Sequence, residues 1–129
     1  MSQIERLNQC RAIHSQLMEG YVDLSRYNEF SAVDYYRLPP DFVNLSAEKE
    51  AFAVTCRTLL EEHFPDDETQ LVLCRTPEVK KHLVVAMGNI MFDPLQATIK
   101  CKKTLERLEY KFMYISRTGG SKTWRKLFR

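Results

Sequence analysis

Apolar residues recur every three or four positions near the start of the chain, which is the spacing of one helix face. The recurring residues are Leu7, Cys10, Ile13, Leu17, Tyr21 and Leu24. Ser2 and Glu5 precede them with the spacing of a capping box. We therefore expect a helix from about residue 2 to 30. Gly20 weakens its later half, so we expect the helix to bend or end there.

The same spacing returns from residue 46 onward, after a connector. Ser46 suits an N-cap, and Glu48 and Glu50 suit the positive end of a helix dipole. An apolar face then follows, made of Phe52, Cys56, Leu59, Leu60, His63 and Phe64, before Pro65 stops the helix. The connector, residues 31–45, contains Pro39 and Pro40 and is rich in aromatic rings. We expect the rings between Phe30 and Phe42 to pack on the rest of the protein.

Residues 66–75 are ambiguous. Leu71, Val72 and Leu73 would suit a buried strand, but a single strand has no partner in this pattern, so the pattern favours a short helix. Thr76-Pro77-Glu78 then indicates a helix start, and Gly88 or Asn89 a helix end. Between them lies a helical apolar face of Val79, Leu83, Val84 and Met87.

Asp93-Pro94 repeats the start signal, and the last helix is expected over residues 94–117. The sequence therefore predicts an all-α, single-domain bundle of four main helices plus one or two short helices. Residues 1–117 would form the bundle and residues 118–129 a basic C-terminal tail. On helix count alone, a compact six-helix arrangement of the death-fold kind is the alternative.

Charge is distributed unevenly along the chain. The 129 residues carry a formal charge of only +2, but residues 100–129 hold ten basic and two acidic residues and residues 1–99 hold nine basic and 15 acidic ones. On the expected last helix, one stripe faces the core: Cys101, Leu105, Leu108, Phe112 and Ile115. A second stripe is basic and consists of Lys100, Lys103, Arg107 and Lys111. It places like charges at i, i+4, which costs a few tenths of a kcal/mol per pair unless an anion offsets it.

This charge pattern predicts a small non-enzymatic protein that contacts the phosphates of RNA or DNA through its C-terminal helix and tail. The expected nucleic-acid-binding residues are Lys100, Lys103, Arg107, Lys111, Arg117, Lys122, Trp124, Arg125, Lys126 and Arg129. Trp124 would stack on a base. The alternative is a protein–protein adaptor whose basic face meets an acidic partner. An acidic membrane surface is not expected, because the tail is too short to bind strongly alone.

A second apolar patch on the expected last helix indicates an interface. Its residues are Leu95, Ile99, Tyr110 and Met113. A helix that is apolar on two sides is either buried between neighbours or used in association, and the commonest oligomer is a symmetric dimer. A homodimer is therefore a possible partner arrangement.

Catalytic, metal and cofactor chemistry is not expected. The four cysteines lie in separate segments without a paired spacing, which favours reduced, buried thiols in a cytoplasmic or nuclear protein. Cys10 and His14 stand at i, i+4, but no second close pair completes a metal site. Lysines surround Cys101 in the sequence, yet its place on the apolar stripe predicts burial rather than reactivity. The stretch "GGSKT" lacks the first glycine of a phosphate-binding loop.

Overall fold

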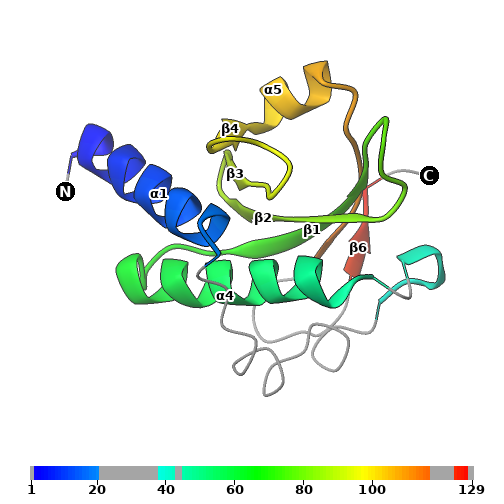
Figure 1. Ribbon diagram of the computed structural model, residues 1–129, viewed down its shortest axis with the longest axis horizontal. Coiled ribbons are helices and arrows are strands. Elements are labelled where there is room, and N and C mark those ends of the chain that lie inside the picture. The colour runs from blue at the N-terminus through cyan, green and yellow to red at the C-terminus, as the bar shows by residue number, and fades with distance from the viewer. Residues whose placement is uncertain (1, 21–37, 43–44, 117–123, 128–129) are drawn as a thin grey trace.

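The computed structural model describes residues 2–20, 38–42, 45–116 and 124–127. In this part of the chain a six-stranded antiparallel sheet is combined with three α-helices, so the domain is mixed α/β and the predicted all-α bundle is wrong (Figure 1). The helices are α1 (Gln3–Met18), α4 (Ala47–His63) and α5 (Lys102–Arg107), and a 3-10 turn spans Pro40–Phe42. The strands are β1 (Gln70–Arg75), β2 (His82–Met87), β3 (Ile90–Phe92), β4 (Lys100–Cys101), β5 (Lys111–Ser116) and β6 (Trp124–Lys126).

The two helices with the clearest local signals are present, the first over Gln3–Met18 and the second over Ala47–His63. Residues 21–30 of the first expected helix lie outside the described residues. At α1 the Ser2 hydroxyl oxygen accepts a hydrogen bond from the Glu5 N–H at 3.1 Å. At α4 the Ser46 hydroxyl oxygen accepts from the Lys49 N–H at 3.4 Å. Helix α1 ends at Met18, and Gly20 follows with φ of +94°, the conformation that glycine adopts after a helix.

The sheet has the order β4-β3-β2-β1-β5-β6. Strand β1 contains Leu71, Val72 and Leu73, and it has partners on both sides, β2 and β5. Both partners come from segments that the sequence pattern assigns to helices. The short helix expected over residues 66–75 and the helix expected over residues 76–88 are therefore replaced by the two central strands.

Three signals that predicted helix boundaries form turns instead. The Thr76 hydroxyl oxygen accepts from the N–H groups of Glu78 and Val79 at 3.3 and 2.9 Å, and the chain turns back into β2. Gly88 has φ of +60° in the two-residue turn that joins Met87 to Ile90, as a type II′ hairpin requires. Asp93 accepts from the Leu95 N–H at 2.9 Å in a turn after β3.

The expected helix over residues 94–117 is replaced by β4, α5 and β5. Helix α5 stops because Glu109 takes a left-handed conformation with φ of +67°. The Tyr110 and Glu109 N–H groups then bond the carbonyls of Leu105 and Glu106, both at 3.0 Å, which is the Schellman arrangement at a helix end. Strand β5 begins two residues after Glu109 and pairs with β1.

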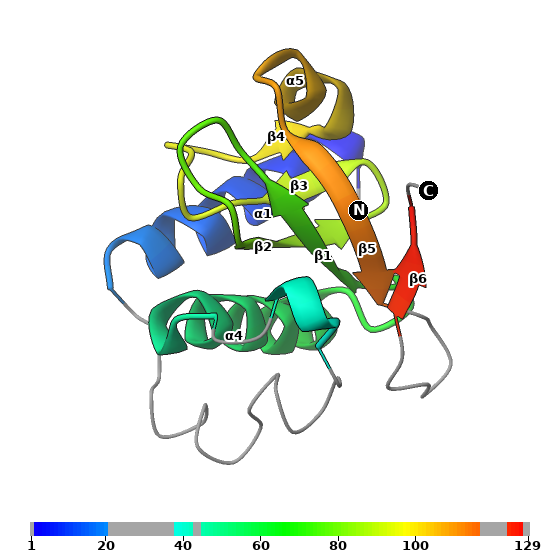
Figure 2. The same cartoon turned by 90° about the vertical axis from the view of Figure 1, so that its right-hand side faces the viewer.

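Two cores cover the two faces of the sheet, as Figure 2 shows with α4 and α5 on opposite sides. The larger core joins the sheet to α1 and α4, and the smaller core joins it to Leu105 of α5. The β1–β5 ladder has a bulge at Met113, which has no partner in β1. Phe112 therefore faces the α5 side and Tyr114 the α4 side, although they are two residues apart. The sheet is thus buried on both faces.

The aromatic connector and the tail both contribute to the larger core. Phe42 is fully buried and meets the Tyr114 ring edge-on, with centroids 5.8 Å apart, so its predicted packing is confirmed. Phe30, Tyr35 and Tyr36 lie outside the described residues. Trp124, expected in a separate tail, belongs to β6 and packs half-buried against the same core.

Candidate nucleic-acid interface

Basic side chains gather on the α5 side of the sheet, although no long helix aligns them. Lys103 and Arg107 are exposed on α5, so their i, i+4 relation survives within this short helix. Lys111 is exposed at the start of β5 and no longer follows Arg107 on a helix. Arg125 pairs with Ile115, which packs with the α5-side core, so cross-strand alignment places Arg125 on this side too.

A small groove lies beside α5 and β5. It has a volume of about 380 Å³ and is lined by Lys102, Glu106, Tyr110, Lys111, Phe112 and Leu127. The Lys102 ammonium lies 6.0 Å from the centre of the Phe112 ring, within the range of a cation–π contact. The same ammonium lies 4.0 Å from the Glu106 carboxylate, and both side chains are half-exposed. An exposed pair of this kind is weak and leaves Lys102 available to a phosphate.

We define the α5 basic face as five exposed cations of α5, β5 and β6. Lys102 and Lys111 line the groove, and the other members are Lys103, Arg107 and Arg125. Glu106 and Glu109 are the acidic residues of α5 and the turn after it, both exposed. The face therefore combines five positive and two negative side chains. Aromatic rings lie in its floor, but Phe112 and Tyr110 are buried, so the face offers cations rather than an open stacking surface.

The remaining residues of the expected binding set are dispersed. Lys100 lies in β4, at the other end of the sheet from β6. Lys126 pairs with Tyr114 and so projects on the α4 side, and Trp124 is packed into that core, away from the α5 basic face. Arg117, Lys122 and Arg129 lie outside the described residues. Lys102 belongs to the α5 basic face but was not among the predicted nucleic-acid-binding residues.

The expected interface residues do not form one patch. Leu95 is 48% exposed in the turn after β3, and Ile99 is partly buried against the larger core. Tyr110 and Met113 are buried in the two different cores. The two-sided apolar helix that motivated a homodimer is absent, and dimerisation remains a prediction without this support.

A buried polar network lies beside the groove and was missed by the sequence analysis. The Asp93 carboxylate is bonded to His82 Nε2 at 2.6 Å and accepts from the Tyr110 hydroxyl at 2.5 Å. The Gln96 amide donates to that hydroxyl at 3.1 Å, and His14 Nε2 lies 2.8 Å from the Asp93 carbonyl oxygen. Gly88 is the sequence feature that could have revealed this network. A hairpin at Gly88 brings residues 82 and 93 to the same end of β2 and β3.

The protonation of this network follows from its surroundings. Burial alone would raise the pKa of Asp93, but the hydrogen bonds and charge from His82, with the hydroxyl of Tyr110, lower it below its usual value. Burial and the Asp93 carboxylate raise the pKa of Tyr110. Asp93 is therefore a carboxylate that anchors Tyr110, and Tyr110 in turn forms part of the groove wall.

The network lacks what cysteine catalysis requires. Cys74 lies opposite His82 in the β1–β2 register, but burial raises the pKa of its thiol, with the nearby Asp93 charge adding to the effect. Neither Cys74 nor His82 lines the groove, and both are fully buried. His82 and Asp93 are thus paired in the buried interior and do not line the groove.

Two expectations about single residues are wrong, and one about the remaining cysteines is confirmed. Cys101 is exposed rather than buried, and hydrogen bonds from Thr104 lower the pKa of its thiol. His63, expected in the core, is exposed at the end of α4. Cys10, Cys56 and Cys74 are buried free thiols, as expected.

Metal ligands and membrane-spanning helices can be assessed for residues 2–20, 38–42, 45–116 and 124–127. There, no three His, Cys, Asp or Glu side chains are placed to hold one metal ion. None of the helices in the described ranges is long and apolar enough to cross a membrane. Comparison of the chain with protein-family models, with curated proteins and with solved structures finds no match.

Proposed function

We propose that the protein binds nucleic acid through phosphate contacts made by the α5 basic face. The observation that carries this proposal is the presence of five exposed cations on α5, β5 and β6, two of which, Lys102 and Lys111, line one groove. Cations spaced over adjoining elements suit the repeating charges of a polyanion better than a single small anion. The protein acts as a binding module in this proposal and not as an enzyme.

The contacts that support the proposal favour the backbone of a nucleic acid over its bases. Lys102 and Lys111 line the groove, but the rings beside them are buried and Trp124 is packed elsewhere. Phosphate contacts position a nucleic acid without reading its sequence. We therefore expect similar affinity for different sequences, and little of the stacking energy that an open aromatic surface would provide.

Single substitutions test the face against the rest of the molecule. Lys102→Gln and Lys111→Gln should each weaken the binding of labelled RNA and DNA, measured by fluorescence anisotropy, by a similar factor for every sequence. Arg11→Gln removes a cation from α1, which packs with the other core, and should leave affinity unchanged.

The outcome separates the two functional classes. Loss of affinity in both α5-face variants with no change in Arg11→Gln would support nucleic-acid binding at this face. An equal loss in all three variants would indicate only general charge attraction and would contradict the proposed site. Absence of binding by the unchanged protein would remove the nucleic-acid proposal and favour the adaptor with an acidic protein partner.

A further inference from the structure

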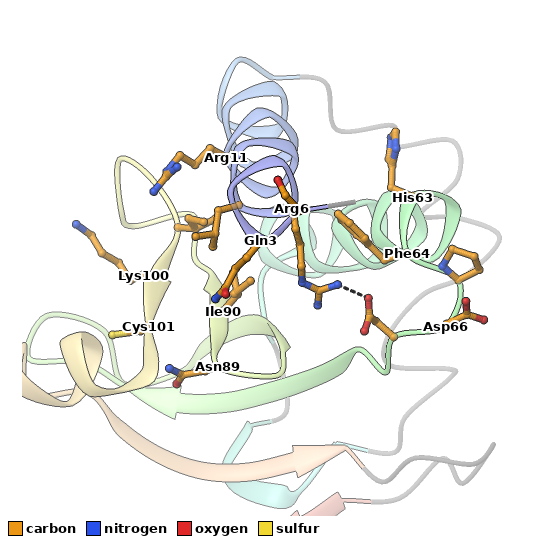
Figure 3. A pocket seen from close by; sticks show the side chains of 15 residues that line it. Gln3, Arg6, Arg11, His63, Phe64, Asp66, Asn89, Ile90, Lys100 and Cys101 are labelled. Atoms are coloured by element: carbon orange, nitrogen blue, oxygen red, sulfur yellow. Dashed lines mark hydrogen bonds and ion pairs between the residues drawn. The ribbon is translucent and has the colours of Figure 1, made fainter.

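A second and larger pocket lies between the start of α1, the end of α4 and the β3–β4 corner of the sheet (Figure 3). Its volume is about 810 Å³. Cavities of roughly 300–1,000 Å³ are the usual size of small-molecule sites. The buried residues of α1 run from Cys10 to Leu17, while Ile4 near its start is 72% exposed, so the first turns of the helix leave room for the pocket.

The walls of this pocket combine apolar and amide side chains. Leu7 comes from α1, and Ile90 and Ile99 come from the β3–β4 corner. Gln3 adds a side-chain amide from the start of α1, and Asn89 adds one from the β2–β3 turn (Figure 3). A ligand here would rest on an apolar surface and would meet neutral hydrogen-bonding groups along its length.

Charge in the pocket is divided between two sides. Arg6 is bonded to Asp67 at 2.5 Å, and its guanidinium lies 5.0 Å from the centre of the Phe64 ring. This contact ties α1 to the end of α4, and the hydrogen bond with Asp67 raises the pKa of Arg6. Arg6 and Asp67 thus largely neutralise each other and form a fixed wall.

Arg11 and Lys100 are placed differently. Figure 3 shows both at the side of the pocket away from Asp66, one from α1 and one from β4. Arg11 donates to the neutral Asn8 amide at 3.0 Å, and within the described residues neither cation forms an ion pair. Two cations from different elements at one side of a partly apolar pocket are complementary to an anion that carries an apolar body.

We propose that this pocket binds a small amphipathic anion. Its carboxylate or phosphate lies beside Arg11 and Lys100, and its apolar body lies on Leu7, Ile90 and Ile99. The proposal does not depend on the α5 basic face, because none of these residues belongs to that face.

The test uses sodium decanoate and decyl phosphate as probes, each below its micelle concentration, and ¹H–¹⁵N correlation spectra of the full chain. We expect saturable shifts of the Gln3 and Asn89 side-chain amides and of the backbone amides of Ile90 and Cys101. Acetate and inorganic phosphate test the head group alone, and decanol tests the apolar body alone. All three compounds should bind at least about tenfold more weakly, since each retains only one of the two kinds of contact.

Substitution and alkylation give two further readouts. Arg11→Gln combined with Lys100→Gln should weaken decanoate binding about tenfold or more through loss of charge-assisted contacts. Lys102→Gln, on the α5 basic face, is the matched control and should leave decanoate binding unchanged. Cys101 is the exposed thiol of the four and lines the pocket, so a bound probe should slow its reaction with iodoacetamide.

Each result decides for or against the proposal. Binding of either probe, weakened by the double substitution, supports it, and the tighter probe identifies the head group. The absence of shifts at about millimolar probe, an affinity that is typical of weak ligands, would overturn it. Equal binding of decanol, or binding unchanged in the double variant, would also overturn it, because the cations would then play no part.

Discussion

Glu109 holds a backbone conformation that L-amino acids rarely adopt, with φ of +67°. The Schellman bonds of Tyr110 and Glu109 stabilise it, and it allows the chain to leave α5 and enter β5. An L-residue in this region is less stable than glycine by about 1–2 kcal/mol. The helix end that separates α5 from β5 is therefore marked by a residue that carries no sequence signal for it.

Glycine at this position should stabilise the fold. We expect Glu109→Gly to raise the free energy of unfolding by about 0.5–1 kcal/mol, because relief of the left-handed strain exceeds the entropy cost of glycine. Urea denaturation followed by circular dichroism measures this. Glu106→Gly, which removes the same charge from inside α5, should instead destabilise by about 1 kcal/mol. A loss of stability in both variants would show that the turn does not hold this strain.

Asp93 is the residue that links pH to stability. Its folded-state pKa lies below the unfolded value, because hydrogen bonds and charge from His82 and Tyr110 outweigh the effect of burial. A carboxyl group with a lowered folded pKa stabilises the fold above its unfolded pKa of about 3.9 and loses this contribution as pH falls through the folded value. Stability should therefore decrease below about pH 4 in part through Asp93.

Tyr110→Phe tests this link without removing the carboxyl group. Loss of the Tyr110 hydrogen bond should raise the folded pKa of Asp93 toward its ordinary value, so the variant should lose less stability between pH 5 and pH 3 than the unchanged protein, from a lower starting stability. Denaturant titrations at several pH values measure the difference. Parallel pH profiles for the two proteins would contradict the role given to Asp93.

At the scale of elements, helices α1 and α4 were predictable because their caps are local. Strands β1 and β2 were not, since a strand covered on both faces has no apolar–polar alternation. All six residues of β2 are buried, and Val79, Leu83, Val84 and Met87 imitate helical spacing. The sequence pattern placed helix starts or ends at Thr76, Gly88 and Asp93. Their hydrogen bonds and backbone angles form turns instead, because the same groups cap helices and close hairpins.

The junction between β1 and β5 depends on Ser116. Its hydroxyl oxygen accepts from the buried Leu71 N–H at 2.9 Å, at the end of the β1–β5 ladder. Ser116→Ala leaves that donor without its acceptor and should lower the free energy of unfolding by about 1–3 kcal/mol. Ser15→Ala, on the exposed side of α1, is the control and should change stability little. Equal effects of the two substitutions in chemical denaturation would contradict the proposed bond.

At the scale of the molecule, the excess of positive charge after residue 100 was evident from the sequence, but its geometry was not. The predicted stripe assumed one helix, and the chain instead places Lys100 in β4, Lys103 and Arg107 in α5 and Lys111 in β5. Lys102 enters the candidate site because α5 begins there and its side chain lines the groove. Trp124 leaves the site because the pairing of β6 with β5 places it on the α4 side. Such pairings between distant segments have no local sequence signal.

The dependence of binding on salt tests the central claim, that the α5 basic face binds nucleic-acid phosphates. If its five cations all engage a duplex, log K should fall against log salt with a slope of about −4.5, and with about −3.5 for a single strand. Replacing both Lys102 and Lys111 with Gln should reduce the duplex slope by about two contacts, to about −2.7, while Arg11→Gln should leave it unchanged. A slope that is the same in all three proteins, or no binding at about 50 mM salt, would contradict the claim.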